Sequence, residues 1–332
     1  MSHGRILALA GGVGGAKLTD GLAQILSPEE LTIIVNTGDD FEHLGLSISP
    51  DVDTVCYTLA GLANPETGWG RAEETFEVLE NIRLLGGPDW FHLGDKDLAT
   101  HIERTRRLNA GQTLTQVTRD LCKAWGVRHT VLPMSDDPVR TMVDTVEFGE
   151  LPFQEYFVHH RCEPRVKGFR FAGMESARPT AQVREAIEAA DAIVIAPSNP
   201  WVSIDPILSV LRLPSSILPP PSTIHGTRSM VHSPLSIIAV SPIIGGKTVK
   251  GPAAKMYAEM GITPSALAVA EHYKDLLTGF VIDTVDAAYA PDLQFTNLQT
   301  CVTNTLMKTQ TDRRRLAQDV LNLIRKMQST TS

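Results

Sequence analysis

The chain has 332 residues, of which 42% are hydrophobic and 20% are charged, and its formal net charge is −8. This length accommodates one large α/β domain or a core domain with a second lobe. The acidic balance argues against broad binding to nucleic acid or anionic membranes, because phosphate groups are held there by clustered Lys and Arg. No apolar run approaches the roughly 20 residues of a membrane helix, so neither a membrane segment nor a signal peptide is expected.

The four cysteines are scattered along the chain and form no C-x-x-C pair. They are Cys56, Cys122, Cys162 and Cys301. This spacing indicates neither a zinc site nor a disulfide framework. We therefore expect reduced thiols in a cytoplasmic protein.

The N-terminal segment predicts a βαβ unit. Residues 5–10 and 31–35 are continuous apolar runs typical of buried strands, and residues 17–26 have the spacing of an amphipathic helix. Between them, residues 11–15 are rich in glycine and predict a turn.

The glycine-rich segment G-G-V-G-G-A-K at 11–17 offers backbone N–H groups at a helix N-terminus, where the helix dipole favours phosphate. It lacks the Gly-Lys-Ser/Thr of a Walker A loop, and Lys17 stands at the third glycine position of the dinucleotide fingerprint. A tight structural turn explains the glycines as well as phosphate binding does. The candidate phosphate-binding residues are Gly11, Gly12, Gly14, Gly15 and Lys17.

Two acidic clusters follow the second strand, N-T-G-D-D at 36–40 and S-P-D-V-D-T at 49–54. Carboxylates at the end of a strand suit a hard cation such as Mg²⁺, which also binds substrate phosphates. The alternative is a turn followed by a helix N-cap at Asp53 or Thr54. The neighbouring glycine segment favours the cation.

The fold class predicted from these patterns is α/β, with a doubly wound, mostly parallel, Rossmann-like sheet and an inserted α+β lobe. Residues 1–66 and 179–332 are expected to form the nucleotide-binding core, and 67–178 the lobe that covers the acceptor site. The other elements predicted for the core are strands at 192–196 and 236–240 and helices at 182–190, 253–260 and 312–327. Those predicted for the lobe are helices at 98–107 and 115–125 and strands at 141–148 and 153–159.

Polar turns follow both later core strands, and ligands of such sheets bind at the carboxyl ends of the strands. Ser198 and Asn199 follow the first strand, and Ser241 and Gly245 follow the second. They are the candidates for binding a nucleotide, although structural turns use similar residues. The proline-rich stretch 213–222 predicts a surface loop or linker, and no chemistry is assigned to it.

Taken in order, these segments resemble the 2-phospho-L-lactate transferase (CofD) family of coenzyme F-420 biosynthesis. The matching segments are GGVGGAK at 11–17, IVNTGDD at 34–40, SPDVDTV at 49–55, GWG at 68–70, LGDKDLATHI at 93–102, LPMSDDPV at 132–139, APSNP at 196–200, AVSPIIGG at 239–246 and TLMKT at 305–309. No single segment is diagnostic, but the ordered set covers nearly the whole chain.

The resemblance implies a guanosine diphosphate-linked lactate, glycerate or enolpyruvate as donor and 7,8-didemethyl-8-hydroxy-5-deazariboflavin (Fo) as acceptor. The ribityl hydroxyl of Fo would attack the phosphorus next to the acid and release GMP. The resemblance also implies a homodimer and Mg²⁺ near Asp40 and Asp53, which are the candidate catalytic residues. The residues implied for Fo are Asp53, Lys96, Thr100, His101 and Asp136. Which aspartate is the base, and which acid is transferred, stay open.

Two rival functions remain. The first is a sugar-nucleotide-binding regulator of a related family, which shares the glycine segment but need not catalyse a reaction. The segments around Asp53 and Lys96 argue against it. The second is a nicotinamide-dependent oxidoreductase, which is disfavoured by Lys17 and by the absence of an evident hydride-transfer pair.

Overall fold

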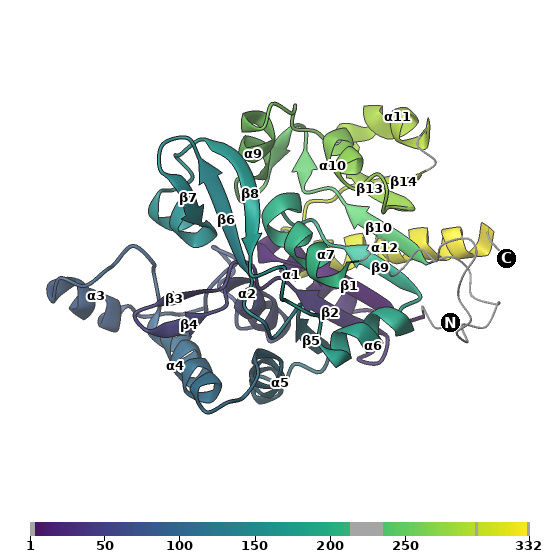
Figure 1. Cartoon of the computed structure of the whole chain (residues 1–332). Coiled ribbons are helices and arrows are strands. Elements are labelled where there is room, and N and C mark those ends of the chain that lie inside the picture. Colours follow the sequence, from purple (N-terminus) through teal and green to yellow (C-terminus); the bar gives the residue numbers. More distant parts are fainter. Residues whose placement is uncertain (1–3, 213–234, 296–297, 331–332) are drawn as a thin grey trace.

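The core of the protein is a seven-stranded parallel sheet with helices on both faces (Figure 1). The structure is a computed structural model and describes residues 4–212, 235–295 and 298–330; the proline-rich stretch 213–222 lies outside them. In sheet order the strands are β14 (Gln299–Thr303), β13 (Gly279–Asp283), β10 (Ser236–Val240), β9 (Ala192–Ile195), β1 (Ile6–Ala10), β2 (Leu31–Val35) and β5 (Thr130–Pro133). The predicted α/β class is confirmed.

Both faces of the sheet are covered by helices, and the central strands β1, β9 and β10 are buried along their whole length. Alternate side chains of β1 point to opposite faces, so Ile6 and Ala8 join one buried cluster and Leu7 and Leu9 the other. The first face is covered by α1 (Gly12–Ala23), α2 (Pro50–Leu59), α5 (Leu114–Ala124) and α12 (Gln310–Thr330). The second is covered by α6 (Ala181–Ala189), α7 (Asp205–Leu211), α9 (Ala253–Glu259) and α10 (Ala266–His272).

Several smaller elements lie beside this core (Figure 1). An antiparallel sheet is formed by β6 (Arg140–Thr145), β7 (Gly149–Pro152) and β8 (Val166–Ala172), and a hairpin by β3 (Phe41–His43) and β4 (Leu46–Ile48). The helices on this side are α3 (Glu77–Leu84) and α4 (Asp95–Asn109). The remaining elements are the π-helices η1 (Glu155–His159) and η2 (Pro200–Ile204), the 3₁₀-helix η3 (Thr284–Tyr289), α11 (Ala290–Phe295), β11 (Ile243–Ile244) and β12 (Lys247–Thr248).

The division into a core of 1–66 and 179–332 and a lobe of 67–178 stays a prediction. The segment 67–178 does hold the antiparallel sheet and both outer helices. It also contributes β5, which pairs in parallel with β2. The segment is therefore joined to the main sheet by a strand of its own.

The predicted turn at 11–15 is wrong, because α1 begins at Gly12, directly after β1. Gly12 has φ +60°, a backbone conformation that residues with a Cβ disfavour. It makes the turn from β1 into α1 within one residue. The later glycines are helical and serve close packing: a Cβ on Gly14 would lie 2.2 Å from the carbonyl oxygen of Pro197.

The predicted strand at 153–159 is also wrong, because residues 155–159 form the π-helix η1. Phe153 and Phe157 stack with ring centroids 5.3 Å apart. Their i, i+4 spacing places them on one side of a helical turn, and the same spacing fits the two-residue period of a strand. Sequence periodicity could not separate the two structures here.

The four cysteines are free, as expected. The fold nevertheless brings Cys56 of α2 and Cys122 of α5 together, with their sulfur atoms 3.2 Å apart. Among the described residues, no helix is both long and apolar enough to cross a membrane.

Gly14→Ala should lower the free energy of unfolding by about 1–3 kcal/mol, because the added methyl group overpacks the contact with Pro197. Gly168→Ala is the matched control, since a Cβ there meets nothing within 4 Å. Urea unfolding of the two variants measures the difference. Equal stability of the two variants would contradict the close contact.

Candidate active site

The main cavity lies where the strand order of the sheet reverses. From β1 the chain continues to β2 on one side, whereas β9 pairs with β1 on the other. The segments that follow β1 and β9, residues 11–14 and 197–199, line a cavity of about 1070 Å³. Open parallel sheets bind ligands at this point, outside the carboxyl ends of the strands.

Two kinds of surface meet in this cavity. Part of its lining is backbone of the glycine segment and carboxylates. Other parts are aromatic, among them the side chains of Trp69, Trp90, Phe91, Phe153, Phe157 and His159. Trp90 and His159 stack with centroids 5.3 Å apart. The cavity thus offers both polar and aromatic contacts to one ligand or to two adjacent ones.

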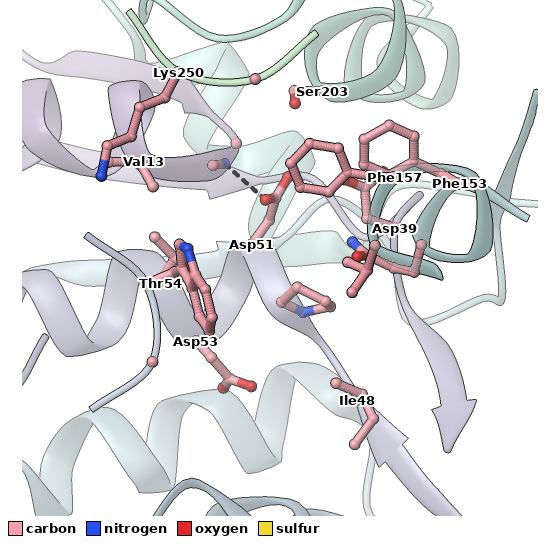
Figure 2. Close-up of a pocket in the computed structure, with 18 of the residues that line it drawn as sticks. Val13, Asp39, Ile48, Asp51, Asp53, Thr54, Phe153, Phe157, Ser203 and Lys250 are labelled. Carbon is pink, nitrogen blue, oxygen red and sulfur yellow. Dashed lines mark hydrogen bonds between the residues drawn. The ribbon is translucent and has the colours of Figure 1, made fainter. Parts of the chain in front are cut away.

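Asp51 occupies the N-terminus of α1. The backbone N–H of Gly12 donates to Asp51 Oδ1 at 2.7 Å, as the dashed line in Figure 2 shows, and the side chain of Asn36 donates to Oδ2 at 2.9 Å. The N–H of Gly11 donates to Ser198 Oγ at 3.1 Å. A negative group is therefore stabilised at the position where helix N-termini bind anions.

Asp39 and Asp51 are both buried and both line the cavity (Figure 2). Burial raises the pKa of Asp51 to about 6. Burial and the nearby charge of Asp51 raise the pKa of Asp39 well above its usual range. Among the described residues, Asp39 Oδ1 has no hydrogen-bond partner. Two buried carboxylates so close together do not both ionise readily at neutral pH without a positive charge beside them.

The two aspartates predicted as catalytic lie in different surroundings. Asp40 accepts a hydrogen bond from Ser49 Oγ at 2.8 Å, and burial raises its pKa to about 7. It does not line either described cavity. Asp53 lines the main cavity and forms a buried ion pair with Arg104. The alternative of a helix N-cap at Asp53 or Thr54 is wrong, because α2 begins at Pro50 and both residues lie inside the helix.

Asp53 belongs to a buried cluster between α2 and α4. His101 Nδ1 lies 3.7 Å from Asp53 Oδ2, and His101 Nε2 lies 3.5 Å from Asp97 Oδ1. Asp97 Oδ1 is in turn 2.7 Å from the hydroxyl of Tyr57. Burial raises the pKa of Asp53, against the opposing charge of Arg104.

Three other residues predicted for the acceptor lie outside the lining of the main cavity. Lys96 Nζ donates to the carbonyl of Ala72 at 3.1 Å. Thr100 Oγ1 lies 2.8 Å from the hydroxyl of Tyr57. Asp136 accepts from the N–H of Thr115 at the start of α5, at 2.7 Å. Their roles in binding Fo stay predictions.

A smaller cavity of about 180 Å³ adjoins the first and shares part of its lining. The shared residues are Val13, Gly14, Pro197, Asn199 and the segment 250–252. Lys17 and Ser241, both predicted for the nucleotide, line it.

Two of the glycines predicted for the nucleotide have other surroundings. Gly15 packs against Ser198, where an added Cβ would lie 2.7 Å from Oγ. The N–H of Gly245 donates to both carboxylate oxygens of Asp286, at 3.0 and 3.1 Å. Neither glycine lines the two described cavities.

Sequence reasoning missed three parts of the site: the contact of Asp51 with the N-terminus of α1, the aromatic side chains that line the cavity, and Arg104. The acidic cluster at 49–54 did contain Asp51, but nothing in one sequence indicates that it contacts Gly12. His101 and Arg104 lie three positions apart (i, i+3) on a predicted helix, which places them on one face. This spacing was the only feature of the two residues in the sequence that indicated their contact.

The sequence of this chain is similar to those of known proteins. The model of the family described as 2-phospho-L-lactate transferase CofD matches residues 6–326. The phosphoenolpyruvate transferase of Streptomyces griseus is 43% identical over 313 residues, which cover 93% of this chain and 94% of that protein. The 2-phospho-L-lactate transferase of Methanosarcina mazei is 40% identical over 283 residues, 85% of this chain and 88% of that protein.

A solved structure is also similar. The crystal structure of a member of the UPF0052 family from Bacillus halodurans superposes with a TM-score of 0.59 and 17% identity, over 97% of this chain and 99% of that chain. At this identity the likeness concerns the fold alone.

Asp40→Asn should flatten the pH dependence of stability in the cation-free protein. The pKa of Asp40 is about 7 in the folded chain, against about 3.9 when unfolded. Between these two pKa values the folded state binds more protons than the unfolded state. The contribution of Asp40 to the free energy of unfolding is therefore complete below about pH 4 and is lost as the pH rises toward 7. Urea unfolding should show that the free energy of unfolding falls between about pH 5 and pH 7. This fall should be smaller in the variant than in the wild type by about 1 kcal/mol or more. An identical fall in both proteins would contradict a raised pKa.

Proposed function

Because this chain belongs to the 2-phospho-L-lactate transferase CofD family and is a transferase of coenzyme F-420 biosynthesis, we propose the reaction that it catalyses. It transfers a phosphorylated three-carbon acid from a guanosine diphosphate-linked donor to the ribityl hydroxyl of Fo. A bond forms between that hydroxyl oxygen and the phosphorus next to the acid. The bond from this phosphorus to the bridging oxygen breaks, and GMP leaves.

The observation that carries this proposal is the mixed lining of the main cavity. The start of α1, buried carboxylates and several aromatic side chains all line it. A diphosphate bridged by a cation suits the carboxylates and the start of α1, because cations and helix N-termini stabilise phosphate. A flat deazaflavin ring suits the aromatic side chains, because they stack on such rings. Reacting groups held side by side gain much of their rate from proximity.

The adjoining cavity supports the placement of the guanosine part. Lys17 and Ser241 line it, and Lys250 lines both cavities. A donor that extends from the smaller cavity past Gly14 would bring its diphosphate to the start of α1. The acid would then lie in the main cavity.

For the transferred acid we propose enolpyruvate. Relatives named phosphoenolpyruvate transferase, from Streptomyces griseus and Thermobifida fusca, are each 43% identical to this chain. The relative named 2-phospho-L-lactate transferase from Methanosarcina mazei is 40% identical.

The carboxylates of the cavity fit a magnesium ion. Asp39 and Asp51 both line it and stand close enough for the charge of Asp51 to raise the pKa of Asp39. Asp39 Oδ1 has no hydrogen-bond partner in the described structure. We therefore favour Asp39 and Asp51 over the predicted Asp40 and Asp53 as residues that would hold the ion. When bound, Mg²⁺ would neutralise the diphosphate.

Asp53 is the better candidate to accept the hydroxyl proton. It lines the cavity, whereas Asp40 does not, and its Oδ2 lacks a hydrogen-bond partner among the described residues. Arg104 compensates for part of the cost of an ionised carboxylate in this buried position. The cytoplasmic location and the homodimer stay predictions.

The purified protein, given Fo and a guanosine diphosphate-linked enolpyruvate, should form coupled product and GMP in equal amounts. Mass spectrometry of the product identifies the acid, since lactate, glycerate and enolpyruvate differ in mass. Donor binding without any product would instead support the non-catalytic regulator.

Activity should be lost in excess chelator and return with Mg²⁺. Asp51→Asn should lower turnover roughly a hundredfold or more while the protein stays folded. The variant removes one of the two carboxylates that would hold the Mg²⁺ ion against the diphosphate. Asp120→Asn is the control, because Asp120 pairs with Arg107 away from the cavity. Full GMP release in chelator would rule out the cation.

A further inference from the structure

The cluster of Asp53, Asp97 and His101 has the composition of a metal site, with one ligand atom from each residue within 4.8 Å of the others. A positive group already lies inside it. The side chain of Arg104 is only 1% exposed, and its Nη2 contacts Asp53 Oδ1. Its Nη1 lies 3.0 Å from His101 Nδ1 and 3.4 Å from the carbonyl oxygen of Ser47.

This contact determines which nitrogen of His101 carries the proton. A guanidinium has only N–H donors and stays protonated in proteins, so Nδ1 of His101 must accept the hydrogen bond. Neutral His101 then carries its proton on Nε2, which lies 3.5 Å from Asp97 Oδ1. Neither ring nitrogen offers a lone pair to a metal ion, and a cation would also be repelled by Arg104.

We propose that Arg104 takes the place of a metal ion in this cluster and is a positioning residue for Asp53 and His101. One arm of its guanidinium holds the Asp53 carboxylate, and the other keeps His101 as a donor through Nε2. Arg104 does not line either cavity, so it acts through these two residues.

The two positioned side chains form a complementary pair at the cavity. Asp53 and His101 both line it, and within the described chain Asp53 Oδ2 and His101 Nε2 have no hydrogen-bond partner. Both atoms are buried, so a ligand hydroxyl that enters from the cavity could donate to Oδ2 or accept from Nε2–H. The effect of Arg104 on Fo, a polyhydroxylated ligand, rests on the proposed function; the proton position on His101 does not.

The proton position can be measured without substrate. Long-range ¹H–¹⁵N spectra distinguish the two tautomers, and the signals missing in His101→Gln identify those of His101. We expect the Nε2–H form. The Nδ1–H form would overturn the proposal.

Counting bound Mn²⁺ by electron paramagnetic resonance tests whether the cluster binds a metal. Wild type and His101→Gln should bind the same number of ions, whatever the function of the protein. Loss of one ion in the variant would show that His101 is a ligand and would overturn the proposal.

Arg104→Lys tests the positioning. A lysine keeps the charge but not the planar fork, so it cannot hold both partners. Affinity for Fo should fall about tenfold or more, whereas affinity for GDP should change less than about twofold, because Arg104 lies outside the smaller cavity. Arg107→Lys on the same helix is the control, since Arg107 pairs with Glu103 and Asp120.

If Arg104→Lys does not fold, the spectra of the wild type and of His101→Gln still decide the tautomer. Unchanged Fo affinity in folded Arg104→Lys would overturn the positioning role. Absence of Fo binding by the wild type would instead contradict the proposed function and leave the tautomer test intact.

Discussion

The site depends on the close contact between the start of α1 and the chain that follows β9. A Cβ on Gly14 would meet the carbonyl oxygen of Pro197 at 2.2 Å, so only glycine allows the helix to lie there. This approach places the Gly11 N–H within 3.1 Å of Ser198 Oγ and aligns α1 so that its N-terminus faces the cavity. Both cavities are lined by Gly14 and Pro197, so this contact shapes the place where the two cavities meet.

Charge balance is the second constraint. The chain is acidic overall and places four buried aspartates, Asp39, Asp40, Asp51 and Asp53, near one cavity. Each has a raised pKa because burial disfavours the ionised form. Nearby donors reduce this cost: Arg104 pairs with Asp53, Ser49 donates to Asp40, and Gly12 and Asn36 donate to Asp51. Asp39 Oδ1 has no hydrogen-bond partner among the described residues, and a cation would supply the missing positive charge there.

Much of the fold could be predicted because it follows from local patterns. The apolar runs of β1, β2, β9 and β10 and the periodicity of α5, α6, α9 and α12 are evident in the sequence. The start of α1 could not be predicted, since the glycines at 12–15 read as a turn until the neighbouring Pro197 is known. The π-helix η1 was predicted as a strand, because the four-residue spacing of Phe153 and Phe157 fits both a helical turn and the two-residue period of a strand. The carboxylates were found as a group, but their individual partners come from segments far apart in the sequence.

The bonds that shape the site have a consequence for how the chain folds. The hydrogen bond from Gly11 to Ser198 joins residues 187 positions apart, and that from Asn36 to the carbonyl of Val202 spans 166. Contacts of such sequence separation form late, because the intervening chain must first be ordered. During synthesis the glycine segment emerges long before β9 exists to receive it. A nascent chain that ends before β9 therefore lacks the contacts that shape the start of α1, and the site cannot be complete until the segment after β9 has been synthesised.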